Sequence, residues 1–322
     1  MPQRPATTPS STLPLELRIA GAGTALGLLD YGAPLTAGDA TAPPVVLLHG
    51  IRDLAWSMDS VAQALRDRYH VWSLDLRGHG ASDHPGAYTF PHYAADLHCA
   101  LVELGLERSL FIGHSLGGQV VCQYAGLFPE RARAVVTIEG LGPPRGPGAD
   151  PELERRHQAR AAIEMLAALD RPPRRLADLE EATARVRANH PGLDSERARF
   201  LAERGTVAHP DGGLRWSWDP RVQATWGSTT RMANEERWSW VRCPTLVVTG
   251  GRAGGFWRDR RGMPDAEDGG MAPEELARRL ACFQNALHVE IACAGHMVHF
   301  DAPDELNRAI AEFLDSLPNP AL

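Results

Sequence analysis

The stretch Leu110-Phe111-Ile112-Gly113-His114-Ser115-Leu116-Gly117-Gly118-Gln119-Val120-Val121 decides how the chain folds. Its centre, G-x-S-x-G, lies between two apolar segments. This order predicts a strand, a sharp turn and a helix, and the glycines two positions before and after Ser115 let the backbone pass close to itself. The Ser115 hydroxyl is then presented at the tip of the turn. The pentapeptide alone also fits an ordinary glycine-bearing loop, and its flanks favour the turn between strand and helix.

A presented serine is a poor nucleophile at neutral pH unless a histidine accepts its proton and a carboxylate orients that histidine. In this setting the expected chain order is serine, acid, histidine. His296 fits the last place, because it follows a predicted strand at 287–291 and precedes a helix predicted to begin near Asp304. His296 is therefore the predicted general base.

Two further motifs accompany the serine and the histidine. Residues 44–50 read PVVLLHG, and residues 75–82 read DLRGHGAS. With the Ser115 pentapeptide and Gly295-His296 they form four ordered motifs, and the chain resembles the α/β-hydrolase superfamily from about residue 15 to residue 317. The resemblance implies an α/β fold with a mostly parallel eight-stranded sheet, flanking helices and a mainly helical cap insertion.

The resemblance also implies roles for particular residues. Ser115 matches the nucleophile, and the backbone N–H of Leu116 would be one donor of the oxyanion hole. The second donor would be the backbone N–H of Ile51, the residue after His49-Gly50. Two preorganised donors of this kind stabilise the negative charge that develops on the attacked carbonyl oxygen.

The acid of the triad is where the sequence departs from the common pattern of the family. Most members place an aspartate three residues beyond the glycine that ends strand seven. That glycine is Gly250, and the position three residues further on is Ala253. Two replacements are open. Asp259 or Asp265, further along the same loop, could supply the carboxylate, or Glu139 could supply it.

Glu139 is the preferred acid. It directly follows the apolar run 134–138, and catalytic groups collect at the carboxyl ends of buried parallel strands. The segment IEGLGP at 138–143 also resembles a serine hydrolase-like subgroup whose triad acid follows strand six. The alternative interpretation is a carboxylate that caps or tethers the turn-rich loop.

The other polar residues near these motifs are interpreted as structural. Histidines inside the motifs set loop geometry, and aspartates in loops bond free backbone N–H groups. The residues interpreted in this way are His49, His79, His114, Asp53, Asp83, His299 and Asp301. Neither a metal nor a cofactor is expected.

The remaining apolar runs predict the layout of the chain. Strands are expected at 15–20, 25–31, 45–48, 71–74, 110–112, 134–138, 246–249 and 287–291, the first two as an antiparallel hairpin. Residues 15–145 and 242–322 would form the core, residues 146–241 the cap, and residues 1–14 a disordered tail. Within the cap, amphipathic helices are predicted at 151–169 and 194–204.

Tryptophans gather near the end of the predicted cap. Six of the eight lie between residues 216 and 257. Trp216, Trp218 and Trp257 are predicted to bind substrate, because indoles in a cap over the active site suit an apolar or ring-bearing molecule. The alternative is that the cluster is ordinary packing.

Composition excludes several classes of function. A formal net charge of −7 without a basic stripe argues against nucleic-acid binding. No run approaches the ~20 apolar residues of a membrane span, and the N-terminal residues lack the apolar core of a secretory signal. The five cysteines have no metal-ligand spacing and are expected to be reduced, which predicts a cytoplasmic protein. The chain contains no lysine, so Schiff-base chemistry on a protein lysine is excluded.

The expected function is cofactor-free hydrolysis of a carboxylic ester or lactone through an acyl-enzyme. A thioesterase, an amidase or a carbon–carbon bond hydrolase would use the same triad, and a hydrolase-derived small-molecule receptor is a candidate from another class. Epoxide and haloalkane hydrolysis in related enzymes use an aspartate nucleophile, and Ser115 occupies that place. The sequence leaves open whether the protein is a monomer or a homodimer.

Overall fold

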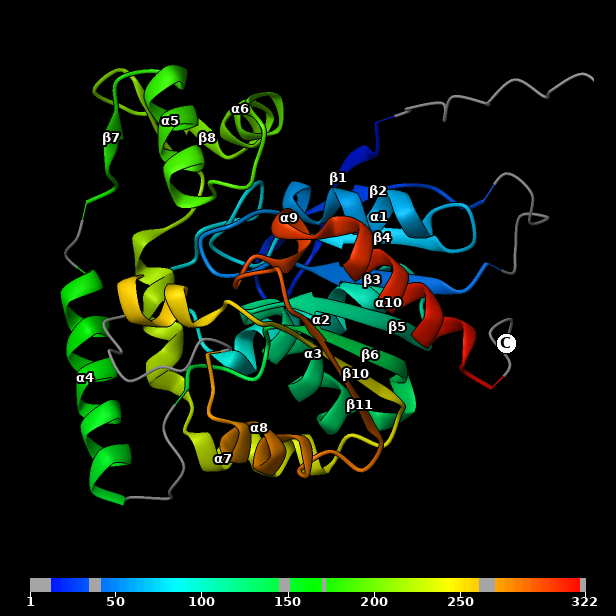
Figure 1. The fold of residues 1–322 in the computed structure, drawn as a ribbon. Helices are drawn as coiled ribbons and strands as arrows, with labels where there is room; N and C mark the ends of the chain where they lie inside the picture. The colour runs from blue at the N-terminus through cyan, green and yellow to red at the C-terminus, as the bar shows by residue number, and fades with distance from the viewer. Residues whose placement is uncertain (1–12, 35–41, 145–150, 170–171, 261–269, 319–322) are drawn as a thin grey trace, which may run out of the picture.

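The computed structural model describes residues 13–34, 42–144, 151–169, 172–260 and 270–318. One eight-stranded sheet runs through the molecule with helices on both of its faces (Figure 1). Its strands are β1 (Leu15–Ala20), β2 (Ala25–Asp30), β3 (Pro44–Leu48), β4 (His70–Leu74), β5 (Ser109–His114), β6 (Ala132–Ile138), β10 (Thr245–Gly250) and β11 (Ala286–Ile291). Each predicted strand is present, with its ends within two residues of the expected ones.

The order of strands in the sheet is β1-β2-β4-β3-β5-β6-β10-β11. The pairs β1–β2 and β2–β4 are antiparallel, and all later pairs are parallel. The predicted mostly parallel sheet of eight strands and the predicted hairpin are therefore confirmed. Strands β6 and β10 are direct neighbours, and this adjacency positions the catalytic candidates described below.

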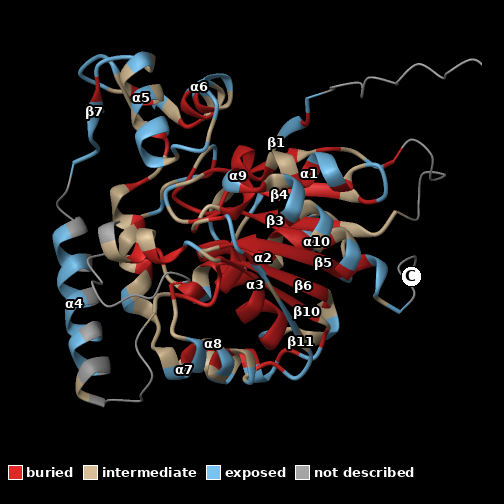
Figure 2. Cartoon of the chain, viewed as in Figure 1, coloured by how far each residue is buried: buried red, intermediate tan, exposed pale blue. Residues whose placement is uncertain are grey.

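Helices cover both faces of the sheet, which explains the continuous apolar character of the central strands. In β3, Val45 and Leu47 contribute to one buried cluster, and Val46 and Leu48 contribute to the other. The first cluster includes residues of η1 (Ala55–Met58), α1 (Asp59–Leu65), α9 (Val298–Asp301) and α10 (Pro303–Asp315). The second includes residues of α2 (Phe90–Glu103) and α3 (Leu116–Leu127), and α8 (Pro273–Leu280) packs against it. Figure 2 shows the sheet as the buried centre of the molecule.

The segment between β6 and β10 carries the inserted elements. They are α4 (Pro151–Leu169), β7 (Arg175–Leu176), α5 (Leu179–Asn189), α6 (Ser195–Arg204), β8 (Thr206–Ala208), β9 (Leu214–Trp216), η3 (Pro220–Ser228) and α7 (Arg231–Ser239). The two predicted cap helices appear as α4 and α6. The small antiparallel sheet β7-β9-β8 and the helix α5 were not predicted. Asp178 and Asp194 begin α5 and α6 by accepting hydrogen bonds from backbone N–H groups in the first turn.

Helix α7 packs on the core, although the sequence places it in the predicted cap. Trp238 is buried and stacks on Phe283 with ring centroids 5.5 Å apart. A side chain at Gly126 of α3 would meet the carbonyl of Arg237 at 2.3 Å, so glycine permits this close approach. Part of the predicted cap therefore belongs to the core. Most of the predicted tail, residues 1–12, lies outside the described residues.

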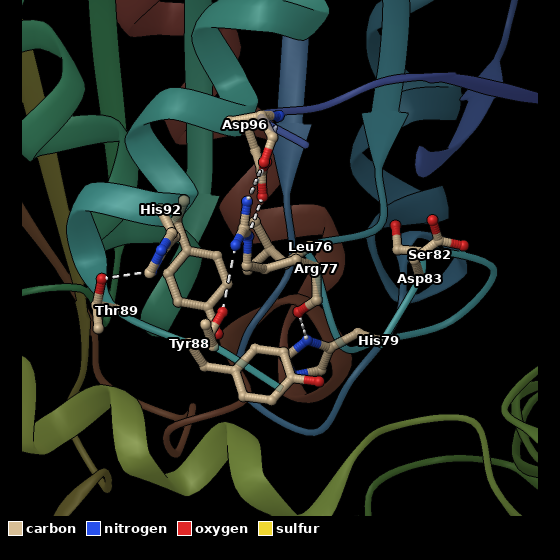
Figure 3. A network of polar contacts seen from close by, with 12 residues as sticks. Leu76, Arg77, His79, Ser82, Asp83, Tyr88, Thr89, His92 and Asp96 are labelled. Carbon is tan, nitrogen blue, oxygen red and sulfur yellow. Dashed lines mark hydrogen bonds and ion pairs between the residues drawn. The ribbon is translucent and has the colours of Figure 1, made fainter. Parts of the chain in front are cut away.

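The loop that follows β4 is held by a buried ion pair (Figure 3). The guanidinium of Arg77 donates to both carboxylate oxygens of Asp96, at 2.5 and 2.6 Å, and both side chains are almost completely buried. Asp75 accepts from the backbone N–H groups of Ala55 and Ala81. This loop is fastened to β3–η1 on one side and to α2 on the other, beside the candidate site.

In the described part of the chain, no helix combines the length and apolar character needed to cross a membrane.

Candidate active site

Ser115 occupies the turn between β5 and α3. Its backbone has φ 51° and ψ −111°, a conformation that non-glycine residues rarely adopt. A Cβ atom at Gly113 would lie 2.4 Å from the carbonyl carbon of Gly117, and one at Gly117 would lie 2.4 Å from the carbonyl oxygen of Leu48. Both glycines are therefore needed for the backbone to turn this tightly.

His296 lies in the loop between β11 and α9 and joins the serine to a carboxylate. Its Nε2 is 3.1 Å from the Oγ of Ser115, and its Nδ1 is 2.8 Å from the Oε2 of Glu139. The carboxylate can only accept, so Nδ1–H donates to Glu139 and the lone pair of Nε2 faces the serine hydroxyl. The structure thus brings the three predicted triad residues into one chain of hydrogen bonds.

Glu139 reaches His296 because β6 and β10 are adjacent and parallel. Ile138 pairs with Val248, and the N–H of Glu139 donates to the carbonyl of Val248 at 2.8 Å. The Oε1 atom accepts the N–H of Gly250 at 2.9 Å, which leaves Oε2 for the histidine. Glu139 also has a positive φ, 51°, which ends the strand and turns the side chain towards the end of β10.

Burial raises the pKa of the Glu139 carboxyl to about 8, and the hydrogen bond from Gly250 opposes that shift. The other carboxylates considered from the sequence are placed differently. Ala253 is fully buried in the loop after β10. Asp259 belongs to η4 (Phe256–Arg260), a π-helical turn, and its side chain is not described; Asp265 lies outside the described residues.

The two predicted oxyanion donors are both near Ser115: Leu116 follows it in the chain, and Ile51 lines the same cavity. Leu116 is the first residue of α3, so its N–H has no carbonyl within the helix. Across the described residues, neither the N–H of Leu116 nor that of Ile51 has a hydrogen-bond partner. Both residues border Ser115 in the fold, because Gly50 and Ile51 line the same cavity as the serine. The two groups are free to bind an oxyanion.

Buried histidines hold the loop that carries Ile51. The Nδ1–H of His49 donates to the carbonyl of Gly50 at 2.6 Å, and its Nε2 accepts the N–H of Leu76 at 3.0 Å. His79 accepts the N–H of Arg52 at 3.0 Å. Burial lowers the pKa of His79 to about 4 and that of His49 well below its usual value, so both rings are neutral. The structural interpretation of these two histidines is in agreement with their contacts.

A cavity of about 260 Å³ opens over the serine. Ser115, His296 and Ile51 line one part of it, and Trp216 and Trp218 contribute from the inserted segment. Helices α5 and α6 supply further apolar and polar side chains, namely Val186, Asn189, His190 and Leu201. The volume is slightly below the range of roughly 300–1,000 Å³ that is typical of small-molecule sites.

Of the three tryptophans predicted to bind substrate, two line the cavity. Trp257 does not line the cavity; it packs edge-on against His296 with centroids 5.3 Å apart and is 5% exposed. Its assignment as a substrate-binding residue is therefore corrected. Trp238 is in the core, Trp226 packs on Phe90, and Trp240 is exposed.

The position of Phe256 against His296 was not predicted from the sequence. Its ring stacks on the imidazole of His296 with centroids 4.0 Å apart and planes 9° apart, and it lines the cavity. Together with Trp257 it fixes two sides of the imidazole, while Ser115 and Glu139 fix its two nitrogens. No motif marks this residue, because the contact depends on the π-helical turn after β10.

Comparison with known proteins places the chain in a family. Residues 43–303 match the family model described as the alpha/beta hydrolase fold. The chain therefore belongs to the α/β-hydrolase family, as its four motifs indicated.

Two relatives whose matches cover more than half of this chain share 30% or less of their residues with it over the matched regions. A serine hydrolase-like protein of Danio rerio is 30% identical over 56% of this chain, and the match spans 56% of that relative, about half its length. Esterase YbfF of Escherichia coli (strain K12) is 27% identical over 84% of this chain and 93% of its own. Among solved structures, a thioesterase domain from the curacin biosynthetic pathway has a TM-score of 0.75 at 24% identity, covering 94% of this chain and all of that one. That last likeness concerns the fold alone.

Proposed function

We propose that this protein is a serine hydrolase that cleaves a carboxylic ester or a lactone through an acyl-enzyme. The observation that carries the proposal is the chain of hydrogen bonds from Ser115 through His296 to Glu139, near two N–H groups for which the described residues supply no acceptor. A relative named as an esterase, 27% identical over most of both chains, supports the same class.

The geometry accounts for each step of such a reaction. His296 takes the proton from Ser115 as the hydroxyl attacks the carbonyl carbon, and the N–H groups of Ile51 and Leu116 hold the oxyanion; one such donor is worth roughly 10²–10³ in kcat in other enzymes. Glu139 keeps Nδ1 protonated and stabilises the imidazolium. Collapse of the tetrahedral species expels the alcohol, which takes its proton from His296. The histidine then activates water to release the acid.

The substrate class follows from the cavity. Two indoles and several aliphatic side chains favour an apolar or ring-bearing group, and the small volume favours a compact one. No cofactor takes part in the proposed reaction. Thioester, amide and carbon–carbon bond hydrolysis remain alternatives that the same three residues can perform, and a receptor with slow turnover is the alternative outside enzymes. The cytoplasmic location and the oligomeric state stay predictions.

Covalent labelling tests the proposal. A fluorophosphonate is expected to label the protein once, at Ser115, and to stop the hydrolysis of short p-nitrophenyl esters. Because the chain has no lysine, trypsin releases the labelled serine in the peptide 109–131, which fragment-ion mass spectra can assign. Labelling without any turnover of esters, lactones or thioesters, combined with tight binding of a ligand, would instead identify a receptor.

The choice of substrate is expected to depend on Trp216 and Trp218. Replacing either by alanine enlarges the cavity and removes aromatic contacts, so relative kcat/KM should shift towards longer or bulkier acyl groups by about 10-fold or more, a change of ~1–3 kcal/mol in differential binding. A panel of p-nitrophenyl esters measures the shift. Trp240→Ala is the matched control, because Trp240 is exposed and does not line the cavity. Identical profiles for all three variants would mean that the two indoles only pack.

A further inference from the structure

Behind the serine, three side chains from distant parts of the chain converge. Asp53 lies in the loop between β3 and η1, His114 ends β5, and His299 belongs to α9. One ligand atom from each, a carboxylate oxygen or a ring nitrogen, lies within 4.8 Å of the other two. The rings of His114 and His299 have centroids 4.5 Å apart.

Four polar atoms of this cluster are buried without a hydrogen-bond partner in the described part of the chain. Among the described residues, the buried atoms without a hydrogen bond include Oδ2 of Asp53, Nδ1 of His114 and both ring nitrogens of His299. The two histidines are each 1% exposed, so water at the surface cannot serve them. Buried polar groups are normally hydrogen-bonded, and convergent unpaired ones indicate a ligand between them. By contrast, both ring nitrogens of the buried His49 make hydrogen bonds.

The hydrogen bond of His114 orients a lone pair into the cluster. Its Nε2 is 2.9 Å from the carbonyl oxygen of His296, which can only accept, so Nε2 carries the hydrogen. Nδ1 is then unprotonated. A histidine that donates one N–H to a backbone carbonyl and offers the other nitrogen is the arrangement found in metal-ligating histidines.

We propose that Asp53, His114 and His299 form a binding site for a divalent transition-metal ion of the Zn²⁺ class. Two imidazoles and a carboxylate are a ligand set that Zn²⁺ and Co²⁺ accept, with a fourth position left open. Zn–N bonds of about 2.0–2.1 Å require ligand atoms roughly 3.3 Å apart, so small side-chain rotations complete the site. The open position would face the substrate cavity, because Asp53 and His114 also line that cavity.

The surroundings are compatible with a cation. In its ionised form Asp53 supplies a negative charge to the cluster. The guanidinium of Arg197, whose charge acts on His299, interacts with the carboxylate of Asp59 at 3.4 Å and with the carbonyl of Trp56 at 3.0 Å. A water molecule bridging the same three groups is the competing occupant, and the experiment below separates the two.

An ion in this site would act on catalysis, a consequence that rests on the proposed function. The ring of His114 lies 5.1 Å from that of His296, centroid to centroid. A second positive charge so close opposes the imidazolium that His296 must form when it accepts the serine proton. Zn²⁺ should therefore lower kcat, and the ion would be an inhibitor of hydrolysis and no part of its chemistry.

Metal binding is measured without reference to activity. Chelator-treated protein is titrated with Co²⁺, and one equivalent is expected to give the visible absorption bands of a low-symmetry four-coordinate site. Zn²⁺ should displace the cobalt and raise the Tm of the wild-type protein. A crystal soaked in Zn²⁺ should show an anomalous peak between the three side chains. A water molecule there with no anomalous signal, or titration without spectral change, would overturn the site even if the esterase is fully active.

Variants assign the ligands. His299→Gln and Asp53→Asn are each expected to weaken Zn²⁺ affinity by about 100-fold or more and to abolish the Zn²⁺-dependent rise in Tm, since outer-shell changes alone cost 10–100-fold. Using two substitutions guards against one that fails to fold. His209→Gln is the control, because His209 lies at the turn between β8 and β9 and accepts the N–H of Asp211. Unchanged Zn²⁺ affinity in both ligand variants, or equal loss in the control, would contradict the assignment.

Discussion

Ser115→Ala is expected to abolish hydrolysis of every ester that the wild-type protein cleaves. The substitution removes the oxygen that attacks the carbonyl, and in a serine protease with the same triad chemistry the loss in kcat is of the order of 10⁶. Only binding and the oxyanion donors then contribute to the residual rate. The measurement is kcat with p-nitrophenyl esters, using protein from which host esterases have been removed.

The fold should survive this change. Among the described residues, the side chain of Ser115 makes one hydrogen bond, with His296, and the residue lines the cavity. Alanine at position 115 would keep the same strained backbone conformation. The substitution neither adds nor relieves backbone strain, so the Tm should stay close to that of the wild type. Ser109→Ala is the matched control, since Ser109 lies on β5 in the same tryptic peptide, is buried, and should leave both labelling and turnover intact. Activity of Ser115→Ala near the wild-type level would refute the serine mechanism.

The middle of the sheet could be predicted because β3, β4, β5, β6 and β10 have both faces buried. Each of these five strands reads as a short apolar run bounded by glycine, proline or polar residues, which is the pattern of a strand covered on both faces. The Ser115 turn could be predicted for a related reason. Gly113 and Gly117 are required by backbone contacts shorter than any side chain allows, so the sequence records the geometry directly.

The sequence of the inserted segment predicts its secondary structure less completely. Strand β7 has two residues and β9 has three, too few to show an alternating pattern. Helix α7 appeared to belong to the cap because it lies before β10 in the chain, whereas the burial of Trp238 against Phe283 is a tertiary contact. Local sequence does not encode which layer a surface helix joins.

The positions of the side chains around His296 also depend on tertiary structure that the local sequence does not encode. Trp257 and Phe256 are neighbours in sequence, and the larger aromatic was the natural candidate for a substrate contact. The π-helical turn sends Phe256 flat against the imidazole and into the cavity, and Trp257 to the edge of the same ring. Likewise, the cluster of Asp53, His114 and His299 has no spacing in the sequence that indicates a common site.

Glu139→Gln is expected to reduce turnover by up to about 10⁴, the cost of replacing the triad acid by its amide in a comparable enzyme. The structure explains the size of the effect. Oε1 accepts the N–H of Gly250, so the amide oxygen of glutamine will take that position and its NH₂ group will face His296. Nδ1 must then accept, which places the proton on Nε2 and points it at Ser115. The histidine can no longer act as a base in that tautomer.

The pH profile separates this account from a general loss of structure. Burial raises the pKa of the Glu139 carboxyl, so the ionised form that orients His296 is lost at a higher pH than it would be for an exposed glutamate, and kcat/KM should fall as the pH drops. Glutamine does not titrate, so the acid limb of the variant should move to lower pH while its plateau stays low. Asp259→Asn and Asp265→Asn should retain both the rate and the profile of the wild type. If instead one of these two lost activity and Glu139→Gln kept it, the acid would be the loop aspartate, and the hydrogen bond between Glu139 and His296 would be only a tether between β6 and the histidine loop.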